Sequence, residues 1–414
     1  MSGGVDSSVA AALLKKAYFD AHGRIRIAEG QRPKTRYSHA GFDVVGIYMK
    51  QWSEPVAAKD RYGFPVAAEH CASEADAEDA RRVAEKIGIP FYVWDFEEEY
   101  KDRVARYMID EYASGRTPNP DVMCNKEIKF GLFLERALQL GADYIATGHY
   151  VTKTAALRIK KREESDNILY NPSTPQTFRS EGVWSKGIAE CILREAKDQN
   201  KDQSYFLWTL TQEQLRHCLF PIGDYLKSEV RAMARTFDLP TAEKKDSQGL
   251  CFVGQVDMRE FLGQYIRREP GAIITASGKT IGRHEGLPFY TIGQRHGIEI
   301  GGGIPYYVAG KDATTNTLVV AEGPYDDALF EKELTAHAVN WISGKAPQLP
   351  LHCEARIRYR QPLQECRVSN VESGNHPPRS TFHIQFKNPQ RAVTPGQSIV
   401  FYKGKEMLGG GIID

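Results

Sequence analysis

The chain has 414 residues, of which 41% are hydrophobic, 26% charged and 10% aromatic, an ordinary globular composition that excludes wholesale disorder. At roughly 150 residues per domain this length predicts two or three domains, and no apolar run approaches the roughly 20 residues of a membrane-spanning helix. The net charge is +1, but residues 335–414 hold ten Lys or Arg and five Asp or Glu, a pattern that favours either a polyanionic partner or a solvated face.

The first part of the chain alternates helix and strand patterns. Helices are predicted at residues 9–16, 72–87, 97–113 and 127–140, and strands at residues 42–49, 91–96 and 143–147. Strands that alternate with helices are typical of a parallel α/β sheet. Two polar stretches, at about 19–40 and 153–195, lack periodicity and are interpreted as irregular insertions.

The rest of the chain divides into a helical and then a β-rich part. Residues 201–268 have mostly helical patterns, whereas short β-rich runs with frequent glycine continue from residue 271 to the end. We therefore expect three parts: an α/β domain over residues 1–200, a central helical and β module over 201–330, and a β-rich C-terminal domain over 331–414.

The seven cysteines do not form the pattern of a secreted disulfide protein or of a common metal site. Their number is odd, the chain is long and no signal peptide is recognised. No Cys-x-x-Cys pair occurs, which disfavours a zinc ribbon and a thioredoxin-type site. We therefore predict no metal site.

A glycine-rich turn at the start of the sequence feeds directly into the first predicted helix. Glycines let backbone amides approach an anion, and a helix N-terminus adds a positive dipole end, so the turn predicts a phosphate cradle. It lacks the Gly-Lys-Ser/Thr ending of a Walker A loop and the spacing of a Rossmann fingerprint. No strand precedes it, so we expect a further N-terminal segment that carries one. The turn consists of Ser2, Gly3, Gly4, Val5, Asp6, Ser7 and Ser8.

Two cysteines lie in polar loops beside cations. Cys124 is followed by Lys126 and Lys129, and a Lys-Lys pair precedes Cys251. Nearby cations favour the thiolate, which is the reactive form. Asp121, three residues before Cys124, is placed to act as an acid or base. Spacing alone does not bring the two cysteines together, and a small buried apolar residue is the alternative for each.

A basic run near the C-terminus is a second candidate surface. On a strand, Arg356, Arg358 and Arg360 would share one face. Three guanidiniums in a row suit a phosphate backbone, and a solvated strand face is the alternative.

Together these motifs resemble the tRNA-specific 2-thiouridylases, and the opening turn resembles the PP-loop of the wider ATP pyrophosphatase superfamily. The matching segments follow the family order over nearly the whole chain. They are Ser2–Ser8, Tyr48–Trp52, Gly115–Gly131, Ala146–Tyr150, Lys201–Leu207, Lys244–Gly254, Tyr290–Arg295, Ile357–Arg360 and Pro395–Gln397.

The resemblance implies a Rossmann-like PP-loop domain with a parallel sheet, a small central module and a C-terminal β-barrel. It also implies roles for individual residues. Ser2–Ser8 would hold the phosphates of ATP, with Met49 and Gly148 near the nucleotide. Cys124 matches the family nucleophile, Cys251 the cysteine that carries persulfide sulfur, and Asp121 would manage protons. The positions that match tRNA contacts are Asn119, Pro120, Asp121, His149, Lys201, Asp202, Gln203, Arg358, Tyr359 and Gln397.

The implied reaction replaces the C2 oxygen of a wobble uridine by sulfur. ATP would adenylate that oxygen, with Mg²⁺ offsetting the triphosphate charge, and the Cys251 persulfide would supply sulfur. Partners would be the anticodon loop of a tRNA, whose bases are already splayed, and a sulfur-donor protein such as a cysteine desulfurase. We further expect a monomer without membrane contact. The two insertions exceed the compact bacterial pattern and favour a mitochondrial enzyme, with a cytoplasmic one as the alternative if the source is bacterial.

Three other interpretations remain open at this point. Another PP-loop ligase acting on a small molecule would explain the opening turn but would leave both cysteine loops unused. A tRNA-binding relative without catalysis would bind RNA and never release pyrophosphate. Cys124, Cys251 and Asp121 could instead hold an iron–sulfur cluster.

Overall fold

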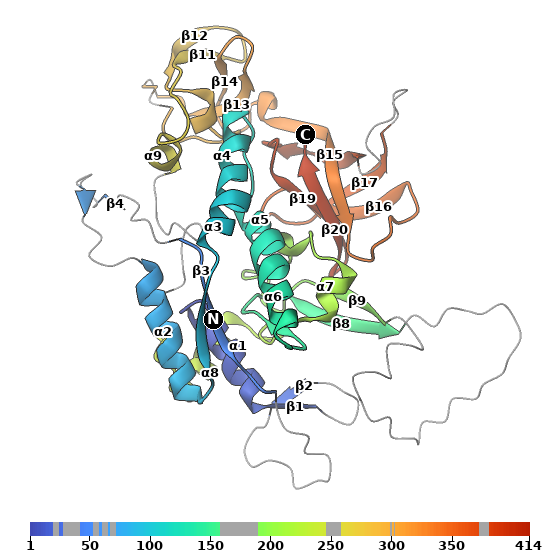
Figure 1. The fold of residues 1–414 in the computed structure, drawn as a ribbon. Helices are drawn as coiled ribbons and strands as arrows, with labels where there is room; N and C mark the ends of the chain where they lie inside the picture. The colour runs from blue at the N-terminus through green and yellow to red at the C-terminus, as the bar shows by residue number, and fades with distance from the viewer. Residues whose placement is uncertain are drawn as a thin grey trace, which may run out of the picture.

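The computed structural model describes residues 1–19, 25–27, 42–52, 58–59, 65–66, 72–157, 189–245, 258–298, 300–301, 303–371 and 381–414. The predicted persulfide carrier Cys251 therefore lies outside the described residues, as does most of both predicted insertions. Figure 1 shows three regions: a mixed α/β part that carries the N-terminus, a small β module, and a barrel that carries the C-terminus.

The N-terminal part is built on short parallel strand pairs, as the sequence predicts. Strand β3 (Gly46–Lys50) pairs in parallel with β6 (Phe91–Asp95), and β7 (Ile145–Ala146) pairs in parallel with β10 (Cys218–Leu219). Helices α1 (Val5–Lys16), α2 (Ala72–Ile87) and α8 (Lys227–Thr236) share one buried cluster of small and branched apolar side chains. Strand β1 (Ala17–Phe19), which ends where the first predicted insertion begins, pairs with β2 (Ile25–Ile27) inside it. Two more short strands pair as β4 (Ala58–Lys59) and β5 (Pro65–Val66).

Two long helical segments pass from this part toward the other modules. The predicted helix at 97–113 is confirmed. It consists of α3 (Glu97–Tyr100), a π-helical stretch η1 (Lys101–Ala105) and α4 (Arg106–Ala113). After a loop the chain continues as α5 (Pro120–Met123), η2 (Cys124–Leu132) and α6 (Phe133–Gln139). Tyr100, Val104 and Met108 on the first segment pack in one core with Val122 and Ile128 on the second.

The interpretation of residues 153–195 as an irregular insertion is wrong at both ends. Strand β8 (Thr152–Leu157) pairs with β9 (Ala189–Arg194), and β9 adds to the edge of β20 (Glu406–Ile413) in the C-terminal domain. The partners are far apart in sequence and the strands are short, so local periodicity gave no signal for them. A 3-10 helix, η3 (Ser204–Leu207), and helix α7 (Gln212–Arg216) follow.

The central module is a four-stranded sheet with the order β12-β11-β14-β13. Its elements are α9 (Met258–Leu262), β11 (Gly271–Thr275), β12 (Thr280–His284), η4 (Leu287–Phe289), β13 (Tyr306–Asp312), β14 (Thr317–Glu322) and, at its end, η5 (Asp327–Leu329).

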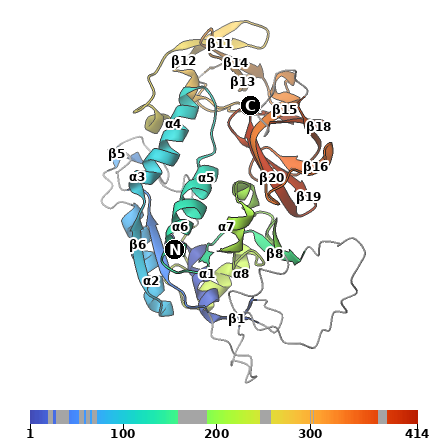
Figure 2. The same ribbon diagram turned by 45° about the vertical axis from the view of Figure 1, so that its right-hand side comes forward.

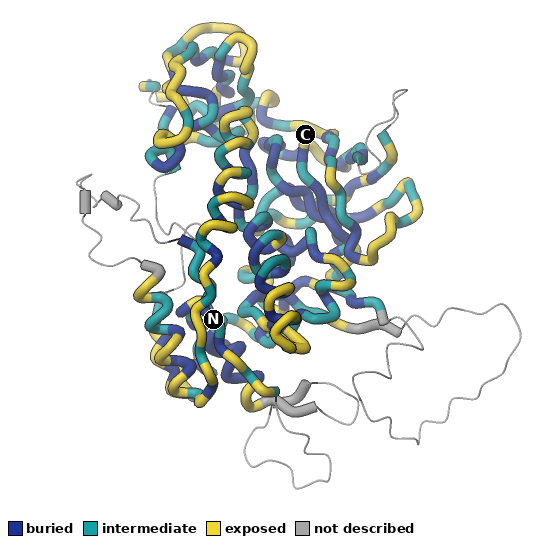
Figure 3. The backbone as a smooth tube through the Cα atoms, viewed as in Figure 1, coloured by how far each residue is buried: buried dark blue, intermediate teal, exposed yellow. Residues whose placement is uncertain are grey.

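The C-terminal domain is a closed barrel, as the family resemblance implies. The strands follow the order β15-β18-β17-β16-β19-β20, and β15 also pairs with β20, which closes the sheet. Trp341 stacks on Phe401 in its core with ring centroids 5.4 Å apart. Figure 2 shows the barrel beside α5 and α7, and Figure 3 shows buried stretches of its strands among exposed ones. The remaining strands are β15 (Phe330–Trp341), β16 (Leu351–Arg356), β17 (Gln364–Asn370), β18 (Phe382–Arg391) and β19 (Ser398–Lys403).

Candidate active site

The predicted phosphate cradle forms the N-terminal end of α1. The Ser2 amide donates to the Ser7 hydroxyl (3.0 Å), and the Ser8 hydroxyl donates to the Gly4 carbonyl (2.8 Å). These two hydrogen bonds with short serine side chains hold the backbone of the turn in place. Gly3 lies against α2, where an added Cβ would be 2.3 Å from the Asp76 carbonyl oxygen. The backbone of the turn thus sits where a helix dipole favours an anion.

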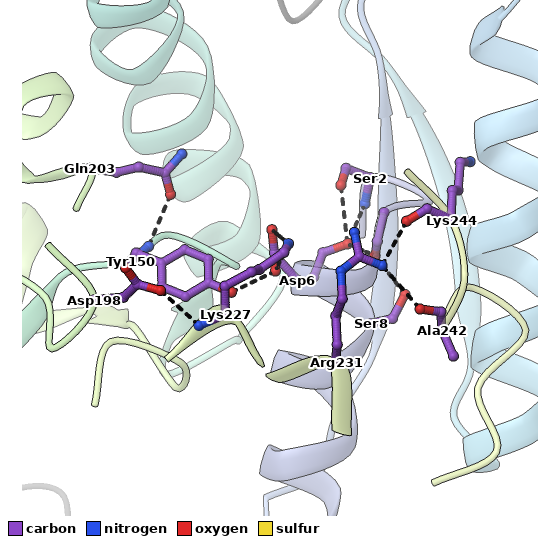
Figure 4. A network of polar contacts seen from close by, with 12 residues as sticks. Ser2, Asp6, Ser8, Tyr150, Asp198, Gln203, Lys227, Arg231, Ala242 and Lys244 are labelled. Carbon is purple, nitrogen blue, oxygen red and sulfur yellow. Dashed lines mark hydrogen bonds and ion pairs between the residues drawn. The ribbon is translucent and has the colours of Figure 1, made fainter. Parts of the chain in front are cut away.

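Asp6 connects this turn to two other segments (Figure 4). Its carboxylate accepts the Tyr150 hydroxyl (2.9 Å) and both of its oxygens accept the Lys227 ammonium (2.7 and 2.8 Å). The Lys227 amide in turn donates to Asp198 (2.9 Å). Lys227 is a site residue that sequence reasoning missed, because no local pattern links two residues that are 221 positions apart.

Gly148, which the resemblance implies lies near the nucleotide, packs directly against the turn. A Cβ on Gly148 would be 2.7 Å from the Ser7 amide nitrogen and 2.8 Å from the Asp6 carbonyl carbon. Met49 lies on β3, one strand position from Tyr48, and packs partly buried against the main core. The chain's first residue runs beside this strand, with the Met1 amine donating to the Ile47 carbonyl.

The segment that leads toward Cys251 begins next to the turn. Arg231 of α8 donates to the carbonyls of Ala242 (3.1 Å) and Lys244 (3.0 Å). The Lys244 ammonium reaches back to Asp76 (2.7 Å) and Asp79 on α2. Through these contacts Lys244 is held against α2, the same helix that packs on Gly3 of the phosphate cradle. After residue 245 the described chain resumes at α9.

Cys124 occupies the junction of α5 and η2. The Asn119 side chain caps α5 by accepting the Val122 amide (3.2 Å), and Pro120 takes the first helical position, where no amide is needed. Cys124 is fully buried, and the Gln51 side chain donates to its Sγ at 3.5 Å. Burial raises the pKa of the Cys124 thiol, and Lys129 opposes that rise.

Gln51 was not assigned a role from the sequence, whereas Lys129 was expected to favour the Cys124 thiolate. Gln51 belongs to a segment that matches the family, yet it comes from the end of β3, 73 residues from Cys124. Lys129 lies one helical turn beyond Cys124, and its charge also lowers the pKa of His149. Of the two lysines that follow Cys124, Lys129 is the one that lowers the pKa of the thiol.

The loop before Asn119 is held by the barrel. The Thr117 amide donates to the Pro395 carbonyl (2.9 Å), and the Gln397 amide donates to the carbonyls of Thr117 and Pro118, both at 2.9 Å. Gln397 was expected to contact tRNA. In the structure its side-chain amide orders the loop that leads to Cys124.

The prediction of three arginines on one strand face is wrong. Strand β16 ends at Arg356, which is buried and ion-paired with Glu195 and with Asp202 (3.5 Å). Arg358 is half-buried and donates to the Ala392 carbonyl (2.6 Å), and burial lowers its pKa. Arg360 is exposed in a turn. The alternating arginines predict one continuous strand, but the strand ends at Arg356 and the backbone turns over residues 357–360.

The other predicted tRNA contacts divide into exposed and internal positions. Tyr359 is half-exposed and lies against Phe206, with ring centroids 4.6 Å apart. Lys201 is also half-exposed. Asp202 is buried and accepts the Ala196 amide (2.9 Å), while the Gln203 side chain accepts the Tyr150 amide (3.0 Å). The side chains of Asp202 and Gln203 thus both hold backbone amides in place, and Asp202 alone of the two is buried.

His149 is buried between two phenylalanines. Its ring centroid is 5.7 Å from that of Phe130 and 6.5 Å from that of Phe220, and Nδ1 lies 2.8 Å from the Thr147 hydroxyl. Burial, with a smaller contribution from Lys129, holds its pKa well below the ordinary 6.5. The imidazole is thus neutral at pH 7.

This depressed pKa predicts an acid-sensitive fold. Below pH 6.5 His149 is protonated in the unfolded chain but stays neutral in the folded protein. The free energy of unfolding should therefore fall as pH decreases, by at most about 1.4 kcal/mol per pH unit from this group. His149→Phe should remove this part of the slope. Urea unfolding of both proteins between pH 7.5 and 5 measures it, and identical slopes would show that the prediction is wrong.

Among the described residues, no group of three or more His, Cys, Asp or Glu side chains is arranged to hold a metal ion. In that same part of the chain, no helix combines the length and apolar character required to traverse a lipid bilayer.

Three family models match consecutive stretches of the chain. They are described as a tRNA methyl transferase HUP domain over residues 32–255, a tRNA methyl transferase PRC-barrel domain over residues 259–322, and an aminomethyltransferase beta-barrel domain over residues 331–413.

Similar proteins span the whole chain. The tRNA-specific 2-thiouridylase MnmA 2 of Geobacillus kaustophilus is 43% identical over 415 residues, which cover 100% of this chain and 93% of that protein. The tRNA-specific 2-thiouridylase MnmA of Streptococcus sanguinis is 42% identical over 419 residues, covering 100% and 94%. The protein of the same name from Protochlamydia amoebophila is 42% identical over 414 residues, covering 100% and 92%.

Proposed function

Because the chain belongs to the family of tRNA-specific 2-thiouridylases, we propose that it uses ATP to replace the C2 oxygen of a tRNA uridine with sulfur. The observation that carries this proposal is the placement of Cys124: a buried thiol at the junction of two helical segments, directly after a loop that the barrel fixes through Gln397. A ligase acting on a small molecule would have no use for that arrangement.

The residues around the opening turn fit a triphosphate. Backbone amides at the start of α1 and the hydroxyls of Ser2 and Ser7 surround a turn whose Gly4 has open space beside it, with only the Ser2 hydroxyl 3.5 Å from an added Cβ. Such a turn binds phosphates through amides and the helix dipole. ATP supplies the adenylyl group that makes the uridine oxygen a good leaving group, and we propose that Mg²⁺ accompanies it to offset phosphate charge.

The cysteines would transfer the sulfur. A persulfide on Cys251 would attack C2 of the activated uridine, and AMP would leave with the former C2 oxygen. The Cys124 thiolate would then attack the Cys251 sulfur, so that a Cys124–Cys251 disulfide forms as the bond to the transferred sulfur breaks. An external thiol would reduce this disulfide afterwards.

Cys124 must lose its proton for that step. Its burial disfavours the thiolate, so the charge of Lys129 and the Gln51 donor are the groups that oppose this cost. Asp121, one turn before Cys124, is proposed to accept the proton as the substrate enters.

We propose the wobble uridine as the target and a sulfur-donor protein, such as a cysteine desulfurase, as the source of the persulfide. Of the predicted tRNA contacts, Tyr359 has a half-exposed ring that could stack on a splayed base, and Lys201 has a half-exposed ammonium that could meet a phosphate.

Thiolation of unmodified tRNA tests the function. Wild-type protein with ATP, Mg²⁺ and sulfide should yield 2-thiouridine, read by mass spectrometry of digested nucleosides. Cys251→Ser should be inactive with a persulfide donor, even if free sulfide bypasses the carrier. A wild-type protein that binds tRNA but never forms 2-thiouridine or AMP would instead be a non-catalytic tRNA binder.

Substitution of Gly148 tests the phosphate cradle separately. Gly148→Ala places a methyl group 2.7 Å from the Ser7 amide nitrogen, so the turn must shift and ATP affinity should fall roughly tenfold or more. Equilibrium binding of a fluorescent ATP analogue measures this effect. Gly301→Ala, where an added Cβ meets nothing within 4 Å, is the matched control. Equal affinities for the two variants would contradict the assignment.

A further inference from the structure

A lysine of the central module contacts the loop that leads to Cys124. Lys311 lies on β13, and its ammonium donates to the Gly115 carbonyl at 3.0 Å. The only other side-chain hydrogen bond from this module to the loop that is found in the described residues joins Thr291 to Thr117 at 3.4 Å. None of the roles implied by the family resemblance falls on Lys311.

The acceptor is a helix end that favours a cation. Helix α4 ends at Ala113, and Gly115 adopts the left-handed backbone (φ +81°) typical of the residue after a helix. Carbonyls at a helix C-terminus carry partial negative charge. Lys311 is partly buried there, and burial lowers its pKa to about 8. A cation held at such a cost is more easily explained by a required contact than by chance.

We propose that Lys311 is a positioning residue for Cys124. It fixes the start of the loop at Gly115, and Gln397 fixes the end of the loop at Thr117 and Pro118. This inference rests on the proposed role of Cys124 in sulfur transfer.

The path from Lys311 to Cys124 is short and continuous. The loop leads directly into Asn119, whose side chain caps α5, and α5 ends at the residue before Cys124. A displaced loop would move the cap and shift the thiol away from Gln51. Since reacting atoms must approach within a few tenths of an ångström of their productive position, a small shift lowers the rate without removing any substrate contact.

The experiment compares Lys311→Met, Lys311→Arg and the control Lys279→Met, an exposed lysine of the same module. Three quantities are measured on the full chain: tRNA affinity, the single-turnover thiolation rate at saturating tRNA, and amide hydrogen exchange over residues 115–124. Lys311→Met should slow the saturated rate roughly tenfold or more, change tRNA affinity less than about twofold and speed exchange in this segment. Lys311→Arg, which can donate to the same carbonyl, should restore most of the rate, and Lys279→Met should match wild type.

Two results would overturn the proposal. Unchanged rate and exchange in Lys311→Met would show that the contact is dispensable. Loss of tRNA affinity with an unchanged saturated rate would make Lys311 a phosphate contact instead. If Lys311→Met does not fold, Lys311→Gln takes its place and is judged by the same exchange criterion. A wild-type protein without thiolation would refute the proposed function, whereas the exchange measurement would still test Lys311.

Discussion

Replacement of Cys124 by serine should lower the thiolation rate roughly a thousandfold or more while the fold and tRNA affinity stay intact. Serine nearly matches the volume of the thiol, so the fully buried position remains filled. A hydroxyl cannot attack the Cys251 sulfur to form a disulfide, so the sulfur on the uridine would not be released. The measurement is single-turnover formation of 2-thiouridine at saturating tRNA, with a thermal melt of each protein.

Cys218 provides the matched control for this prediction. It is also fully buried, and its thiol donates to the Gln214 carbonyl at 3.0 Å, a bond that a serine hydroxyl can make. Cys218→Ser should therefore retain wild-type activity. If Cys124→Ser also retained activity with a persulfide donor, the proposed disulfide step would be wrong. The iron–sulfur alternative would be wrong as well, because Cys124 is one of its three cluster ligands.

Replacement of Arg356 by methionine should cost about 3–5 kcal/mol of folding stability. Arg356 is 6% exposed, and its guanidinium pairs with Glu195 and Asp202 and lies 4.7 Å from the centre of the Tyr402 ring. Burial already raises the pKa of both carboxyls. Without Arg356, two buried carboxylates at the junction of β9, η3 and the barrel would have lost their shared cation.

Urea unfolding at pH 7 measures this loss. Arg360→Met is the control, because Arg360 is exposed and its loss should change stability by less than about 0.5 kcal/mol. The deficit of Arg356→Met should shrink as pH falls toward the ordinary carboxyl values of 4.5 and 3.8, because folded carboxyls with raised pKa values then bind protons more readily than the unfolded chain. A deficit below about 1 kcal/mol at pH 7 would mean that the ion pairs contribute little.

Local sequence patterns predicted the parts of the site that depend on neighbouring residues. The turn at Ser2–Ser8 opens α1, and the helix over residues 97–113 forms as its charge and apolar spacing indicate. The order of motifs also singled out Gly148, which packs on Ser7, while its expected contact with ATP stays a prediction. What these patterns specify is backbone conformation, which is determined within a few residues.

Contacts between distant segments could not be predicted in this way. Arg356 looked like one of three surface cations, yet its partners Glu195 and Asp202 come from a region that showed no regular pattern. Gln397 was identified as important, but its contact with Thr117 depends on how the barrel closes against the loop. The family resemblance thus identified Gln397 as a site residue but did not predict which atoms its side chain contacts.

The most direct test of the central claim follows the oxygen that leaves the uridine. A tRNA whose target uridine carries ¹⁸O at C2 is thiolated in a single turnover, and the AMP is analysed by mass spectrometry. If the enzyme adenylates that oxygen, each 2-thiouridine formed should be accompanied by one AMP that carries one ¹⁸O atom in its phosphate. Label found in inorganic phosphate or water, or 2-thiouridine formed without AMP, would contradict the account.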